Sequence, residues 1–269
     1  RKMRQEMKPG DLHHIETQCY SGTAAVKRIC TLSPTQKTPL LVDYEIENYG
    51  ETAPFIIPGN AGVNYLADDR RNRSGMPKEY VYKTGRDFNW NLYDTDIEIQ
   101  KKISNAFVIH FKEFRKQGRG LYIHSQVKGS GKTMLACCLA NEVLKTHDIS
   151  VKFISMPEYI ELVKDKREEK IQQRETILDA ALLILDDIGA AVEDKEWIRN
   201  SVFRLVNRRH ENLLPTIYTS NVPIDKLKCG ERVTSRIYED SFQLSMPEIS
   251  IRMKKADISK AEFFRQVTE

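Results

Sequence analysis

The sequence contains no apolar run that approaches the ~18–20 residues a membrane-spanning helix needs, so we expect no contact with a membrane. Residues 1–8 are polar and charged with no apolar stretch behind them, and we expect no signal peptide. There are 5 cysteines and no CxxC pair, which argues against a zinc site. Free thiols fit a reducing compartment, and we expect a cytoplasmic protein.

The sequence also lacks a large excess of one charge, since it has 42 Lys and Arg and 38 Asp and Glu, a net charge of +4. This small excess permits local nucleic-acid binding but does not demand it, and a solvated surface explains it equally well. Hydrophobic residues make up 40% of the 269 residues, enough for an ordinary packed core. The length fits one large domain plus a smaller one.

The first part of the chain differs in pattern from the rest. Residues 38–57 alternate apolar and polar side chains, which predicts one or two strands broken at Gly50, and a helix-like stretch follows over about 62–73. The turn residues SGMP at 74–77 mark a boundary. We therefore expect a small N-terminal α+β region over 1–74, which could bind a partner, and a main domain over 75–269.

In the main domain, predicted helices and strands alternate. Helical spacing of apolar residues predicts helices over 96–117, 133–146, 157–178 and 197–212. Short apolar runs predict strands over 121–124, 151–155, 181–185 and 216–219. This alternation indicates βαβ units and an α/β fold with a parallel sheet flanked by helices.

The segment GSGKT at 129–133 follows a predicted strand and opens a predicted helix. Glycines let backbone N–H groups converge on phosphate oxygens, and the helix N-terminus adds positive potential. Lys132 adds a charge near the β- and γ-phosphates, and the Thr133 hydroxyl would bind Mg²⁺. We therefore expect a site for ATP and Mg²⁺ whose nucleotide-binding residues include Lys128, Gly129, Ser130, Gly131, Lys132, Thr133 and Met134.

This loop departs from the usual GxxxxGK[ST] pattern at its first position. Gln126 stands where the pattern has glycine, or Ser125 does if the loop is one residue longer. Glycine there permits a tight turn out of the strand, so its absence puts the geometry and affinity of the loop in question. A glycine-rich turn capped by Thr133 is the alternative that the string alone leaves open.

Polar side chains end two further predicted strands. Asp186 and Asp187 follow an apolar strand, where buried carboxylates cost free energy unless they have a partner such as Mg²⁺. We assign Asp186 to the metal and Asp187 to polarising the attacking water. Asn221 ends the strand within PTIYTSN at 215–221, and we assign it to the attacking water or the γ-phosphate. A strand cap for the two aspartates and a turn for Asn221 are the structural alternatives.

Residues 74–251 resemble the DnaC/DnaI-type replicative helicase loaders, AAA+ ATPases that are grouped with the IstB-type transposition ATPases. The matching segments are SGMPKEY at 74–80, GSGKT, LLILDDIG at 182–189, FRLVNRR at 203–209, PTIYTSN and GERVTSRI at 230–237. The resemblance implies an AAA+ P-loop core with a short C-terminal lid-like segment and ATP hydrolysis. Many relatives have Glu where this chain has Asp187, so we expect slow turnover.

The resemblance also implies roles for three arginines. Arg236 is similar to the arginine finger that reaches the γ-phosphate of a neighbouring subunit, and Arg232 is the second candidate. Arg252, in a segment similar to the end of these loaders, is the candidate for sensor 2. A solvated helix face is the alternative for Arg232 and Arg236, which are spaced i, i+4.

As partners, the resemblance implies a replicative helicase, single-stranded DNA and an ATP-dependent homo-oligomer. Residues 1–74 do not match the N-terminal domain of these loaders. The predicted helix 157–178 carries basic residues and Tyr159, which could contact DNA, but interleaved acids fit a salt-bridged helix equally well.

Two other functions stay open on the sequence. One is an IstB-like transposition helper acting on a transposase and duplex DNA, and another is a nucleotide-gated protein that captures a helicase or loader without turnover. A small-molecule P-loop kinase is disfavoured, because sensor and finger patterns stand where such a kinase needs a substrate lid.

Overall fold

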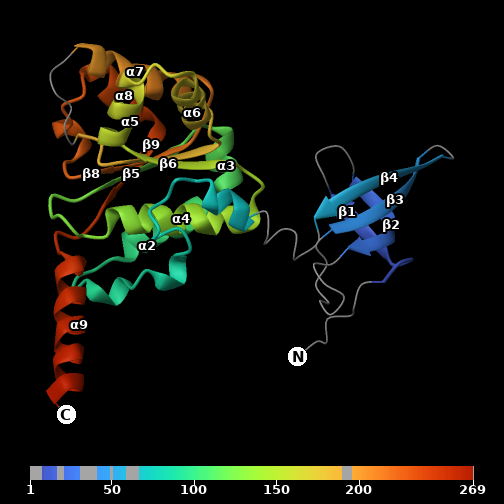
Figure 1. Cartoon of the computed structure of the whole chain (residues 1–269), viewed down its shortest axis with the longest axis horizontal. Helices are drawn as coiled ribbons and strands as arrows, with labels where there is room; N and C mark the ends of the chain where they lie inside the picture. The colour runs from blue at the N-terminus through green and yellow to red at the C-terminus, as the bar shows by residue number, and fades with distance from the viewer. Residues whose placement is uncertain are drawn as a thin grey trace. The chain divides into compact units, whose positions relative to one another are not determined.

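The computed structural model describes residues 8–16, 21–30, 41–48, 51–58, 67–189 and 196–268. The chain divides into two compact units, residues 1–69 and 70–269, and each is described by itself (Figure 1). The division falls before the turn at 74–77 because the preceding residues are tied to the second unit. Phe153 N donates to Ser74 O at 2.7 Å, and Arg70 pairs with Asp148.

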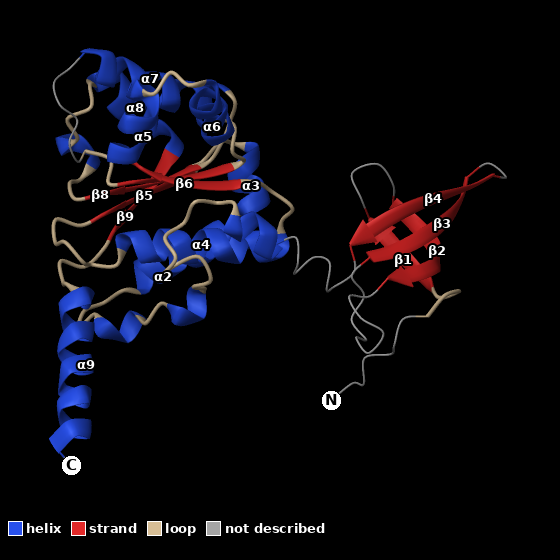
Figure 2. Ribbon diagram, in the orientation of Figure 1, coloured by secondary structure: helices blue, strands red, loops and turns tan. Residues whose placement is uncertain are grey.

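The first unit contains an antiparallel sheet with the strand order β1-β2-β3-β4. Its strands are β1 (Leu12–Glu16), β2 (Ser21–Cys30), β3 (Leu41–Asn48) and β4 (Glu51–Pro58) (Figure 2). The sequence predicts one or two strands over 38–57, and the structure has two, β3 and β4, whereas Gly50 lies outside the described residues. We did not predict β1 and β2, because β2 mixes small and basic residues with a register shift between Val26 and Arg28. Residues 67–72 are helical, within the stretch expected.

The second unit is built on a parallel sheet with the strand order β6-β7-β8-β5-β9. Its strands are β5 (Gly120–His124), β6 (Val151–Ser155), β7 (Leu182–Asp186), β8 (Thr216–Ser220) and β9 (Ser241–Ser245). Strand β8 lies between the strand that precedes the glycine-rich loop and the strand that ends in Asp186. The expected α/β fold is confirmed, and β9 is an addition that we did not predict.

Helices cover both faces of this sheet (Figures 1 and 2). One face carries α2 (Glu98–Ile109) and α4 (Lys132–Thr146), and the other carries α5 (Met156–Lys164), α6 (Glu168–Leu178), α7 (Glu196–Glu211) and α8 (Glu231–Asp240). The remaining helices are α3 (Phe111–Lys116), α9 (Ile251–Thr268) and three short 3-10 turns at Gly85–Asp87, Trp90–Leu92 and Ile224–Lys226. Strand side chains alternate between the faces, so Leu121 and Ile123 join one apolar core and Tyr122 the other.

Two of the predicted helices are each interrupted. The helix expected over 96–117 is divided into α2 and α3 at His110, and the one expected over 157–178 into α5 and α6. At the second break, the Asp165 carboxylate accepts hydrogen bonds from the backbone N–H and the guanidinium of Arg167. This local bonding competes with helical hydrogen bonds, and apolar spacing alone did not reveal it.

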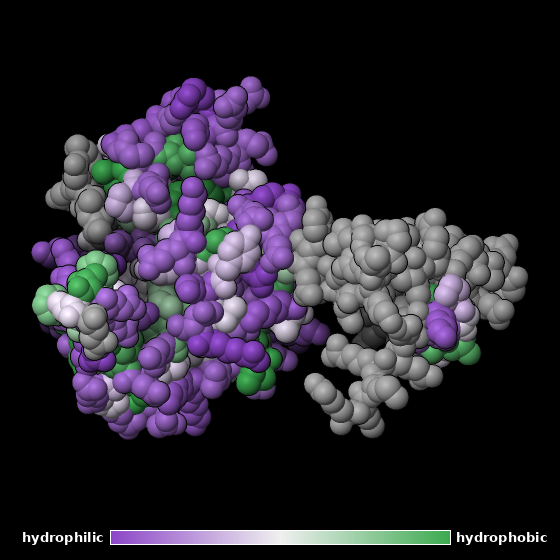
Figure 3. All heavy atoms as spheres, turned by 60° about the horizontal axis from the view of Figure 1, so that its bottom comes forward, coloured by the Kyte–Doolittle hydropathy of each residue, from purple (hydrophilic) through white to green (hydrophobic). Residues whose placement is uncertain are grey.

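Within the described part of the chain, no helix is long and apolar enough to span a membrane. The face of the second unit in Figure 3 is largely hydrophilic, with small apolar patches between charged side chains. Cys137 and Cys138 are buried in α4, as expected of core thiols.

Arg209, near the end of α7, is 1% exposed and lies beside the residues that precede β7 and β8. Its guanidinium donates to Leu178 O and Ala180 O at 2.9 Å, ahead of β7, and to Pro215 O at 2.7 Å, just before β8. It also donates to Thr216 Oγ1 at 2.7 Å. Burial lowers the pKa of Arg209 to about 10, so the side chain stays charged at neutral pH.

Replacing Arg209 with Met should lower the free energy of unfolding by roughly 3 kcal/mol or more, because several buried carbonyl oxygens lose their donor. Urea unfolding followed by circular dichroism measures this change. Arg208→Met is the matched control, since Arg208 pairs near the surface with Glu175 and Asp179 and should contribute about 1 kcal/mol or less. Equal losses in the two variants would contradict this role for Arg209.

Candidate functional site

The glycine-rich loop has the backbone shape that its sequence predicts. Gly129 and Gly131 have φ of +80° and +92°, and Gly131 caps α4, which begins at Lys132. A Cβ on Gly129 would come within 2.8 Å of Ser250 Oγ, so a larger residue does not fit there. Position 126 does not require glycine, because its φ is not positive. Among the described non-glycine residues, only Asp187 and Leu213 have positive φ. The departure from the pattern therefore introduces no backbone strain.

Lys132 is 6% exposed and folded into the loop. Its ammonium donates to Ser125 O and Val127 O at 3.1 Å and to Ser130 Oγ at 3.2 Å. Burial lowers the pKa of Lys132, while nearby carboxylates, Asp187 first among them, act in the opposite direction. The ammonium is thus held by neutral oxygens that a phosphate would outcompete, because hydrogen bonds between charged groups are the stronger ones.

Asp186, at the end of β7, is hydrogen-bonded directly to Thr133, the residue with which we expect it to share Mg²⁺. Its Oδ1 accepts from Thr133 Oγ1 at 2.8 Å and from Thr219 Oγ1 at 2.6 Å. A carboxylate beside a hydroxyl is an oxygen donor pair that suits Mg²⁺. Among the described residues, no group of three or more His, Cys, Asp or Glu side chains could hold a metal alone. Mg²⁺ typically takes few protein ligands and completes its shell with phosphate and water, so the pair fits.

Asp187 begins the turn after β7 with φ of 54°, a left-handed conformation that Asp tolerates better than most residues. Its backbone N donates to Thr219 Oγ1 at 2.9 Å, and its Oδ1 accepts from Asn221 Nδ2 at 3.3 Å. Asp187 and Asn221, both of which we expect near the attacking water, are therefore hydrogen-bonded to each other. We did not predict that Thr219 would link Asp186 to the backbone of Asp187. The signal available in the sequence was a polar residue inside a predicted strand.

A pocket of about 610 Å³ collects most of these side chains. Of the expected residues, it is lined by Lys128, Gly129, Ser130, Gly131, Lys132, Thr133, Met134, Asp187, Asn221 and Arg252. Asp186 contacts this set through Thr133. Four other lining residues were not assigned from the sequence, namely Glu79, Tyr80, Ile251 and Lys255. Tyr80 carried a signal, since it ends the segment at 74–80 that resembles the loaders.

Arg232 and Arg236 do not line this pocket. The guanidinium of Arg236 lies over the ring of Phe203 on α7, 5.0 Å from its centroid, and its Nε is buried without a hydrogen-bond partner. Arg232 is exposed. Arg252 differs from both, because it lines the pocket and its backbone N donates to Gly129 O at 3.1 Å.

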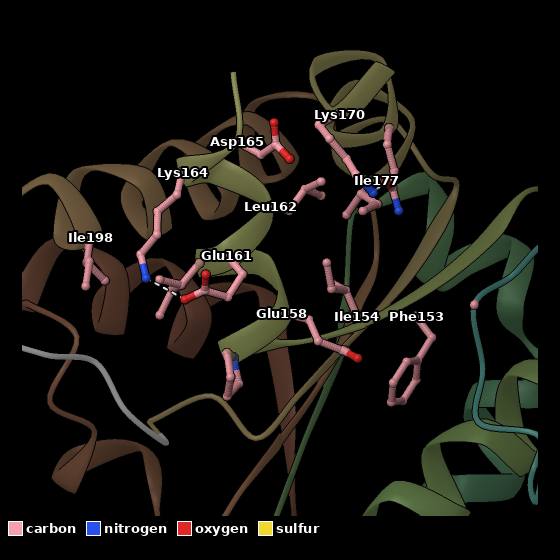
Figure 4. Close-up of a pocket in the computed structure, with 14 residues that line it drawn as sticks. Phe153, Ile154, Glu158, Glu161, Leu162, Lys164, Asp165, Lys170, Ile177 and Ile198 are labelled. Atoms are coloured by element: carbon pink, nitrogen blue, oxygen red, sulfur yellow. Dashed lines mark hydrogen bonds and ion pairs between the residues drawn. The ribbon is translucent and has the colours of Figure 1, made fainter. Parts of the chain in front are cut away.

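Helices α5 and α6, where the sequence leaves DNA contact open, form a surface of mixed charge. Tyr159 is 2% exposed and its hydroxyl donates to Ser201 O, so the idea that it stacks on a base is wrong. Lys164 pairs with Glu161, and Arg167 with Asp165. These helices border a groove of about 740 Å³ along β6 whose lining combines apolar residues with both signs of charge (Figure 4). The contacts favour the salt-bridged interpretation of this face.

The parallel sheet, the glycine-rich loop and the carboxylates at the neighbouring strand end define an AAA+ P-loop nucleotide-binding protein. Within that class, the chain belongs to the family of IstB-like ATP binding proteins, whose model matches residues 81–230, more than half of the chain.

The chain is also similar to helicase loaders. It is 29% identical over 141 residues to the replicative helicase loader DnaI of Bacillus subtilis (strain 168), a match that covers 49% of this chain and 44% of the relative. A crystal structure of DnaI has a TM-score of 0.55 at 24% identity, covering 67% of this chain and 98% of that chain. The DnaC helicase loader has a TM-score of 0.50 at 25% identity, covering 63% and 99%. The predicted resemblance is confirmed, although the chain spans less than half the length of the DnaI relative.

Asp186→Asn should raise the melting temperature of the nucleotide-free protein near neutral pH. Burial raises the pKa of Asp186, while hydrogen bonds from Thr219 and Thr133 partly oppose this. A carboxyl with a raised pKa binds more protons folded than unfolded, so its contribution to stability falls as the pH rises from the unfolded to the folded pKa. Asparagine keeps the Oδ1 acceptor and removes the charge.

The gain should shrink as the pH falls toward the unfolded pKa of about 4, because the charge that burial penalises is progressively lost there. Thermal unfolding across this range measures the effect, with Asp257→Asn on the exposed part of α9 as the control. A variant that is less stable than the parent at every pH would contradict the expected direction of the change.

Proposed function

We propose that this protein hydrolyses ATP and acts in DNA replication as a helicase loader, which delivers or remodels a replicative helicase on single-stranded DNA. One observation carries the proposal: the phosphate loop, Asp186, Asp187 and Asn221 meet at one pocket in a chain similar to DnaI and DnaC. The cytoplasm as its site of action is part of the proposal.

In this proposal the residues of the phosphate loop and of the neighbouring strand ends have stated tasks. The N–H groups of 129–133 and the Lys132 ammonium bind the phosphates, and Arg252 adds a second cation. Thr133 and Asp186 would hold Mg²⁺, which supplies positive charge beside the β- and γ-phosphates. Asp187 takes the proton of the attacking water, and Asn221, which donates a hydrogen bond to the Asp187 carboxylate, binds the attacking water or the γ-phosphate. The side chain of Asp187 is shorter than Glu, which supports slow turnover.

The partners follow from the same comparison. A replicative helicase is the protein partner, residues 1–74 are the region that we assign to it, and residues 75–269 form the ATPase domain with α9 as its lid-like segment. ATP favours a homo-oligomer in which Arg236 of one subunit completes the site of the next. An IstB-like transposition helper is the second candidate, which the family match favours.

ATP turnover by the purified protein, with and without single-stranded DNA, is the first test. We expect slow hydrolysis that single strands stimulate more than duplex does. Lys132→Ala should abolish nucleotide binding, and Asp187→Asn should bind ATP normally but lose turnover by roughly 100-fold or more, as for loss of a general base. Stimulation by duplex alone would favour the transposition helper, and ATP binding without turnover, even with helicase present, would contradict the proposed enzyme.

Mixing two inactive variants tests the role of Arg236. Arg236→Ala should bind ATP like the parent but hydrolyse it at least roughly 10³-fold more slowly, because an arginine finger stabilises charge in the transition state. Adding Asp187→Asn subunits should restore part of the activity, since their Arg236 can complete an intact neighbouring site. Arg232→Ala tests the second candidate, because loss of activity in Arg232→Ala but not in Arg236→Ala would assign the finger to Arg232. Mixtures that stay inactive although they assemble would contradict action between subunits.

A further inference from the structure

Two side chains of opposite charge hold the start of the phosphate loop. Lys132 Nζ donates to the carbonyl oxygens of Ser125 and Val127 at 3.1 Å. Glu248, from the connection between β9 and α9, accepts from Gln126 N at 3.0 Å, Val127 N at 2.9 Å and Ser125 Oγ at 3.1 Å. The peptide unit that joins Ser125 to Gln126 is therefore bonded to an ammonium through its carbonyl and to a carboxylate through its N–H.

Glu248 belongs to a segment that follows the loop along its length, residues 246–252, which we call the brace. At one end of the brace, Met246 N donates to His124 O at 2.7 Å, and at the other Arg252 N donates to Gly129 O at 3.1 Å. The brace leads into α9, which places Lys255 as well as Arg252 at the pocket. The loop and the start of α9 are thus bonded to each other.

The position of Glu248 coincides with the departure of the loop from its usual pattern. Gln126 stands where the pattern has glycine, and its N–H precedes the groups at 129–133 that would face phosphate. The Glu248 carboxylate accepts the backbone N–H groups of two consecutive residues, Gln126 and Val127, one with each oxygen. Glu248 is not among the residues that line the pocket, so it acts on the loop rather than on the nucleotide.

We propose that Glu248 is a positioning residue of the nucleotide site, which fixes the start of the phosphate loop so that the N–H groups of 129–133 point at the phosphates. This inference rests on the proposed nucleotide chemistry and deepens it. When a phosphate draws the Lys132 ammonium away from Ser125 O and Val127 O, the bonds to Glu248 remain. Charge-assisted hydrogen bonds are strong enough to keep the loop in place during that exchange.

Glu248→Ala should raise the dissociation constants of ATP and ADP about tenfold, the loss expected for one net hydrogen bond to a charged group. Titration of a fluorescent ATP analogue, with ATP and ADP as competitors, measures this. Hydrogen exchange of the nucleotide-free protein should speed up at the backbone amides of residues 126 and 127. The exchange rates of the amides in the parallel sheet should stay unchanged. Glu262→Ala, which removes the same charge from the exposed part of α9, should leave both measurements unchanged.

Glu248→Gln keeps the shape of the side chain and one acceptor oxygen, and its affinity should lie between those of the parent and Glu248→Ala. It also decides the matter if Glu248→Ala does not fold, since weaker binding by Glu248→Gln supports the proposal and parent-like binding overturns it. If Glu248→Ala lowers the melting temperature but leaves the dissociation constants unchanged, Glu248 has only a structural role, and this result also overturns the proposal. If the parent itself shows no Lys132-dependent binding, the proposed function fails instead.

Discussion

One carboxylate oxygen determines the geometry of the pocket. Asp186 Oδ1 receives the hydroxyl of Thr133 from the first turn of α4 and that of Thr219 from β8, so three distant segments meet at a single atom. Thr219 also accepts the N–H of Asp187, which supports the left-handed turn that brings Asp187 to Asn221. Burying this anion costs free energy, which the two hydroxyl groups offset in part. The protein thus gives up stability at the nucleotide pocket.

The opposite ends of the same two strands are fixed by a buried cation. Arg209 binds carbonyl oxygens just before β7 and β8, and Asp186 at the end of β7 binds the hydroxyl group of Thr219 near the end of β8. Both charges are satisfied by neutral hydrogen-bonding groups rather than by each other. The two strands are therefore tied together near both ends. Ligands of open parallel sheets bind outside the carboxyl ends of the strands, and this is where the pocket lies.

What could be predicted from the sequence follows from this topology. Lys132, Asp187 and Asn221 each stand in a linear motif at a strand end, and parallel strands bring such ends to one edge of the sheet. Thr219 and Glu248 stand in no motif, and their roles depend on which segments pack beside them. Tyr159 shows the same limit, because helical spacing did not reveal that its side chain faces the core. Gln126 is tolerated without glycine because its backbone does not adopt positive φ.

The balance of charge in the pocket indicates what a single chain does not supply. Its lining holds four cations, Lys128, Lys132, Arg252 and Lys255, against two anions, Glu79 and Asp187, and the Asp186 carboxylate lies just behind. A triphosphate carries more negative charge than this small excess can neutralise. Mg²⁺ held by Thr133 and Asp186 would supply part of the difference. Arg236 rests on Phe203, outside the pocket of its own chain, so under the proposed mechanism the remaining cation arrives only when subunits assemble. Such a division would make hydrolysis depend on assembly rather than on nucleotide binding alone.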